Sequence, residues 1–71
     1  MNAKRFANPK KVGSALLVAS VFHARRRIDV LETLAGDFIV REKTGPDTAR
    51  LIGITPTLRS AEFLATKEVK S

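Results

Sequence analysis

The fold of this chain is decided by residues 20–54, which read SVFHARRRIDVLETLAGDFIVREKTGPDTARLIGI. Three consecutive arginines, Arg25 to Arg27, stand in a segment whose apolar residues recur at helical spacing. Strand-forming residues and a Gly-Pro turn follow this segment. The order predicts a basic helix that leads directly into a two-stranded β-hairpin.

Length and composition describe one small domain without covalent staples. The chain has 71 residues, no cysteine and a single histidine. A core of this size is marginal, so assembly into a homodimer is one way for the protein to gain stability. Neither a thiolate metal site nor a multi-histidine centre can be built, and no cofactor is expected.

The net charge is strongly positive. It amounts to +6 at neutral pH, and seven basic residues precede the first acidic residue, Asp29. Such a field favours an anionic partner, with nucleic acid foremost. The alternative is a basic segment that is merely solvated.

The N-terminal half is predicted to be helical. Residues 1–9 read as a basic arm, followed by a first helix over residues 10–19 and a second over residues 21–35. Ser20 would cap the second helix, and Gly36 would end it. One long helix over residues 10–35 stays open as an alternative, because no strong helix breaker interrupts this stretch.

In the second helix, Ala24, Ile28 and Leu31 would form the face that packs against the core.

The C-terminal half reads as a hairpin and a last helix. Residues 37–43 and 48–54 are rich in strand formers and flank turn residues at 44–47. A helix is expected over residues 56–66, and residues 67–71 should fray. The folded domain would thus cover residues 10–66. The expected class is α+β, with two N-terminal helices, a hairpin and a C-terminal helix.

A basic start before the apolar run GSALLVASVF resembles the beginning of a secretory signal peptide. The run is too short to span a bilayer, and no small-residue cleavage pattern follows it. Export is therefore the weaker alternative. A cytoplasmic protein without a membrane partner is expected.

Residues 25–64 resemble the winged helix-turn-helix half of MarR-type transcriptional regulators, and the likeness extends loosely back to residue 12. The motifs that carry it are I-D-V-L-E at 28–32, an apolar strand running into Arg-Glu at 38–42, Asp47 and Arg50 in the wing, and Ile-Thr-Pro at 54–56. Whether the chain is a truncated form of a longer regulator stays open.

The resemblance implies a transcriptional regulator that binds double-stranded DNA, with the second helix in the major groove and the hairpin as a wing on the adjacent backbone or minor groove. Arginine suits guanine edges and phosphates because its guanidinium donates two parallel hydrogen bonds. The expected DNA-binding residues are Lys10, Lys11, Ser20, Val21, Phe22, His23, Arg25, Arg26, Arg27, Arg41, Lys43 and Arg50.

No enzyme is expected. His23 has no nucleophile or carboxylate placed as its partner, and Asp29 and Glu32 read as salt-bridge partners of the arginines. Glycines 45 and 53 belong to no phosphate-binding motif. The alternative function is a small basic adaptor that binds RNA or an acidic protein partner through the same face.

Overall fold

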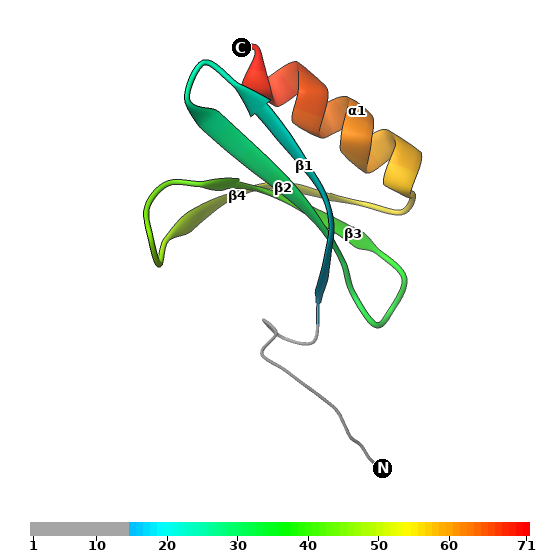
Figure 1. The fold of residues 1–71 in the computed structure, drawn as a ribbon. Helices are drawn as coiled ribbons and strands as arrows, with labels where there is room; N and C mark the ends of the chain where they lie inside the picture. Colours follow the sequence, from blue (N-terminus) through cyan, green and yellow to red (C-terminus); the bar gives the residue numbers. More distant parts are fainter. Residues whose placement is uncertain (1–14) are drawn as a thin grey trace.

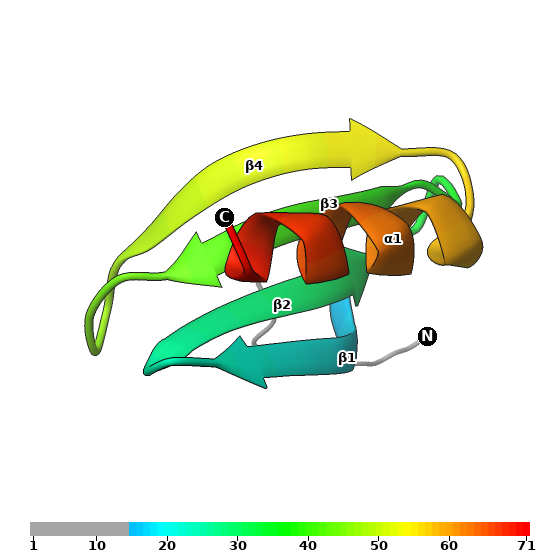
Figure 2. The ribbon, with the colours of Figure 1, turned by 90° about the horizontal axis from the view of Figure 1, so that it is seen from above.

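The computed structural model describes residues 15–71, which form a four-stranded antiparallel sheet and one helix. The elements are β1 (Leu16–His23), β2 (Arg26–Glu32), β3 (Phe38–Lys43), β4 (Ala49–Thr55) and α1 (Leu58–Val69). The strands lie in the order β1-β2-β3-β4, so each pairs with its neighbour in sequence. The helix runs back across one face of the twisted sheet (Figures 1 and 2). We call the opposite side the open face.

The expected winged helix-turn-helix is wrong. Residues 16–23 and 26–32, which were predicted to be helical, are the strands β1 and β2 and pair as a hairpin. Residues 10–14 of the predicted first helix lie outside the described part of the chain. β-Branched residues explain the preference for strand, because Val21, Ile28 and Val30 fit a pleated sheet better than a helix.

The turn between β1 and β2 consists of Ala24 and Arg25, which have φ angles of 49° and 70°. Positive φ at both central residues matches the twist of a two-residue hairpin. Two helix-boundary predictions fail with the helix. Ser20 lies within β1, and Gly36, with φ 95°, belongs to the loop between β2 and β3.

The predicted C-terminal half is confirmed in its elements. β3 and β4 form the expected hairpin, although it is half of the sheet and not a separate wing. α1 begins after Thr57, whose Oγ1 accepts a hydrogen bond from the backbone N–H of Ser60 at 3.1 Å. The helix continues to Val69, past the expected end at Thr66.

The core lies between the sheet and α1. Ile28, Val30 and Val40 point from the central strands toward the helix, which contributes two buried alanines and Val69. Small side chains let the helix approach closely. Gly53 also faces it, and a Cβ atom there would lie 3.0 Å from Cδ2 of Leu64. Within residues 15–71, no helix has the length and apolar character needed to cross a membrane.

Candidate nucleic-acid interface

The pairing register assigns side chains to the open face. Ile28, Val30 and Val40 face α1, so their neighbours in β2 and β3 face the other way. An extra residue in β4, Ile52, shifts the register there and brings two apolar side chains of β4 to the same side. The open face therefore carries Leu17, Ser20, Phe22, Arg27, Asp29, Leu31, Ile39, Arg41, Lys43, Ala49, Leu51 and Ile54.

On the helix side, two arginines are held by two carboxylates. Arg26 donates twice to Glu42, with both N–O distances at 2.9 Å, and once to the backbone carbonyl of Glu68 at 2.9 Å. Arg50 donates to Glu42 at 2.8 Å and lies 3.4 Å from the Glu68 carboxylate. We call these four residues the helix-side network. Its cations are engaged in holding α1 to the sheet.

The helix-side network shifts the pKa of Glu42. Hydrogen bonds from Arg26 and then from Arg50 lower the pKa of this carboxyl from 4.5 to about 2, although desolvation acts in the opposite direction. The same bonds to Glu42 raise the pKa of both arginines. Glu42 is therefore ionised throughout the neutral range, and its charge is compensated locally.

On the open face, Arg27 stands between a buried carboxylate and an exposed aromatic ring. Its Nε donates to Oδ1 of Asp29 at 2.9 Å, and Ser20 Oγ donates to the same oxygen at 2.7 Å. Asp29 is only 4% exposed. The guanidinium of Arg27 also lies 5.7 Å from the centre of the Phe22 ring, which is 68% exposed. This arrangement presents a flat apolar surface next to a cation.

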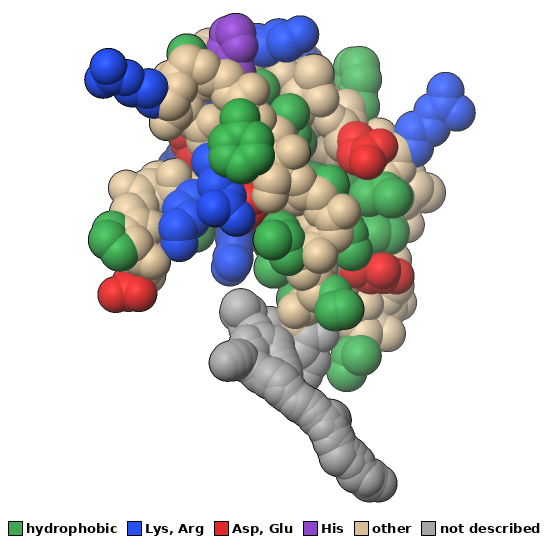
Figure 3. Space-filling model, viewed as in Figure 1, with side chains coloured by type: hydrophobic (Ala, Val, Ile, Leu, Met, Phe, Trp, Pro, Cys, Tyr) green, Lys and Arg blue, Asp and Glu red, His purple; other side chains and the backbone are tan. Residues whose placement is uncertain are grey.

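Arg41 and Lys43, both from β3, form no ion pair with any residue of the described chain. Lys43 Nζ donates to the backbone carbonyl of Pro46 at 3.0 Å, a neutral acceptor that leaves its charge uncompensated. Arg41 Nε is buried and has no hydrogen-bond partner among the described residues. In the space-filling view, Lys and Arg side chains gather beside hydrophobic ones over the strands (Figure 3).

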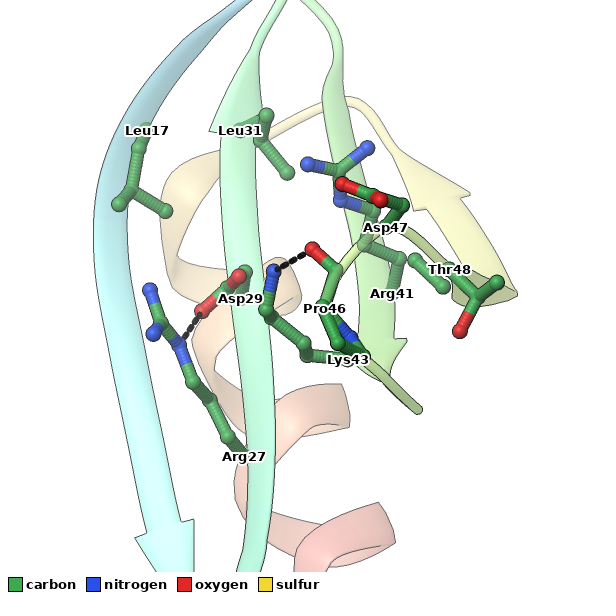
Figure 4. A pocket seen from close by; sticks show the side chains of 10 residues that line it. Leu17, Arg27, Asp29, Leu31, Arg41, Lys43, Pro46, Asp47 and Thr48 are labelled. Carbon is green, nitrogen blue, oxygen red and sulfur yellow. Dashed lines mark hydrogen bonds and ion pairs between the residues drawn. The ribbon is translucent and has the colours of Figure 1, made fainter.

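A pocket of about 560 Å³ lies on the open face where the β3–β4 loop borders the sheet. Figure 4 shows Arg27, Arg41 and Lys43 around it, with Leu17 and Leu31 on the strands and Pro46 to Thr48 in the loop. The pocket combines three cations with two carboxylates, Asp29 and Asp47, and with apolar side chains. Within residues 15–71, no group of three acidic, histidine or cysteine side chains is placed to hold a metal ion.

The structure separates the residues that were expected to act as one DNA-binding surface. Five of them share the open face: Ser20, Phe22, Arg27, Arg41 and Lys43. Arg25 lies in the exposed β1–β2 turn, and His23 is exposed at the end of β1. Val21 packs against the core, while Arg26 and Arg50 belong to the helix-side network. Lys10 and Lys11 lie outside the described residues.

The sequence did not predict the pocket, the residues that line it, or the burial of Asp29 beside it. Asp29 was expected to pair with the arginines and does pair with Arg27, but it is buried and also positions Ser20. Leu17, Leu31 and Ala49 were not recognised as lining residues. A period-two reading of β2 would have placed Arg27, Asp29 and Leu31 on one face.

Comparisons of the chain with protein-family models, with curated proteins and with solved structures found no significant match. Because the architecture is not a winged helix, the resemblance to MarR-type regulators carries no functional argument.

Proposed function

We propose that this protein binds nucleic acid, with DNA as its ligand, on the open face of the sheet. The observation that carries the proposal is that the two sides of the sheet differ in how their cations are paired with carboxylates. On the helix side, Arg26 and Arg50 are compensated by Glu42 and Glu68. On the open face, Arg41 and Lys43 have no carboxylate partner among the described residues.

The chemistry of the open face suits a polyanion that also carries flat apolar groups. Arginine and lysine bind phosphates, and exposed aromatic rings stack on bases. Phe22 and the Arg27 guanidinium supply such a stacking surface within reach of the β3 cations. Antiparallel strands are also used to contact DNA in known β-sheet readers, so a recognition helix is not required. Control of transcription is the role that DNA binding would serve.

Fluorescence anisotropy with a labelled DNA oligonucleotide tests the proposal. The double variant Arg41→Ala, Lys43→Ala should weaken binding by roughly a hundredfold, at about tenfold for each lost phosphate contact. It should also flatten the dependence of affinity on salt, by a slope of about one for each contact.

The matched control removes the same charge from the other side of the molecule. Arg59→Ala with Lys67→Ala changes two exposed cations of α1 that form no ion pair within residues 15–71. This variant should bind nearly as well as the unaltered protein. Equal losses in both double variants would show that only net charge matters, and the open face would not be the binding surface.

An acidic protein is the second candidate partner, and it has one specific observation in its favour. Leu51 and Ile54 are each 60% exposed on the open face, next to its cations. A mixed apolar and basic surface is typical of protein interfaces as well. Leu51→Ser with Ile54→Ser separates the two candidates, because DNA affinity should persist in this variant whereas affinity for a protein partner should be lost.

A further inference from the structure

The pocket beside the β3–β4 loop has features that a flat phosphate-binding surface does not need. It is bordered on one side by Pro46 and Asp47 of the loop and on the other by Leu17 and Leu31 of the sheet (Figure 4). Its volume of about 560 Å³ falls in the range of sites for small organic ligands, roughly 300–1,000 Å³. Cations border it from two strands, Arg27 from β2 and Arg41 and Lys43 from β3.

The hydrogen-bonding state of these cations indicates an anionic occupant. Arg27 already donates to Asp29, and Asp29 is satisfied further by Ser20. Arg41, in contrast, has a buried Nε without a partner in the described chain. Nε itself is closed to a ligand, but no hydrogen bond or ion pair within the described chain engages the rest of the Arg41 guanidinium, which lines the pocket and can donate to an external acceptor. A phosphate group supplies such an acceptor with the complementary charge.

We propose that this pocket holds one unstacked nucleotide, which makes a single strand, and not a duplex, the preferred ligand. Arg41 and Lys43 would bind the phosphate, and the base or sugar would pack on the exposed side chains of Leu17 and Ala49. A nucleotide in a duplex is paired and stacked, and bringing it under the loop costs the energy of flipping it out. A single strand carries no such cost. This inference rests on the proposed function.

A pocket-filling substitution tests the inference without changing any charge. Ala49→Phe places a ring in the pocket at an exposed strand position where an aromatic residue is well tolerated. The probes are a labelled thymidine oligonucleotide of about ten residues and a hairpin duplex of similar length. The unaltered protein should prefer the single strand, and Ala49→Phe should weaken that binding by roughly tenfold with little effect on the duplex. Thr66→Phe, at an exposed position of α1, should change neither.

The outcomes separate this inference from the proposed function. If the protein binds DNA but Ala49→Phe binds both probes as the unaltered protein does, the pocket is not a nucleotide site and the open-face proposal stands. If the unaltered protein binds neither probe, both fall. A circular dichroism melt establishes that each variant is folded. Should Ala49→Phe not fold, Arg41→Met decides instead, because it must abolish the preference for the single strand, and a preserved preference overturns the inference.

Discussion

The three arginines at positions 25–27 are adjacent in sequence but occupy three different environments. Arg25 lies in the exposed turn, Arg26 is held by Glu42, and Arg27 pairs with Asp29 on the open face. Alternation along β2 accounts for the difference between Arg26 and Arg27, since successive side chains of a strand point to opposite faces. A run of like charges in a strand is therefore shared between two surfaces and does not form one patch.

Glu42 gives the stability of the protein a defined pH dependence. Because its folded-state pKa is lowered from 4.5 to about 2, the stabilisation it contributes is fully present above pH 4.5 and is lost as the pH falls toward 2. Glu42→Gln should therefore be less stable than the unaltered protein at neutral pH, and the difference should shrink steadily between pH 4.5 and 2. Urea denaturation at a series of pH values measures this.

Glu62→Gln is the control, since Glu62 is exposed on α1 and forms no ion pair within the described residues. Its stability should follow that of the unaltered protein at every pH. A Glu42→Gln deficit that stays constant from neutral pH down to pH 2 would mean that the carboxylate is not held by Arg26 and Arg50 as described.

The β1–β2 turn provides the sharpest test of the hairpin. Ala24 and Arg25 adopt positive φ angles, a conformation that costs residues with a Cβ roughly 1 kcal/mol each. Replacing the pair with Asn-Gly, the preferred sequence for such turns, should stabilise the protein by about 1 kcal/mol in urea denaturation. In a helix over residues 21–35 the same change would be destabilising, chiefly through the glycine. A loss of stability would therefore contradict the hairpin.

The sequence predicts an element correctly where turn or capping residues mark its ends, and wrongly where no such residues are present. The β3–β4 hairpin was predicted because Gly45, Pro46 and Asp47 mark its loop, and α1 because Thr55-Pro56-Thr57 marks its start. The β1–β2 turn has no glycine, asparagine or proline, so its two strands merged into an apparent helix.

Apolar spacing strengthened that error. Ala24, Ile28 and Leu31 fall on one face of a hypothetical helix. In the structure, Ala24 is exposed in the turn, and the side chains of Ile28 and Leu31 point to opposite faces of the sheet. The preference of Val21, Ile28 and Val30 for strand was outweighed by Leu, Ala, Arg and Glu, which favour helices. The open face could not be predicted from helical geometry, because strand pairing alone brings Phe22 and Arg41 to the same side of the sheet.

At the scale of the whole molecule, one layer of helix on one sheet leaves half of the sheet surface without a covering element among residues 15–71. That surface carries both apolar and basic side chains, with exposed Phe22, Leu51 and Ile54 on the same face as Arg41 and Lys43. The positive net charge predicted an anionic partner, and that expectation is retained in the proposed function. The surface proposed to bind that partner is a face of the sheet instead of a helix.

Binding of nucleic acid to the open face can be mapped residue by residue in an NMR titration of the isotope-labelled protein with a DNA oligonucleotide. We predict that backbone amide signals move for Phe22, Arg27, Arg41 and Lys43 and for the β3–β4 loop, residues 44–48. Signals from the exposed positions of α1, residues 58–69, should stay in place. Shifts concentrated in α1, or no shifts at a large excess of DNA over protein, would show that nucleic acid does not bind the open face.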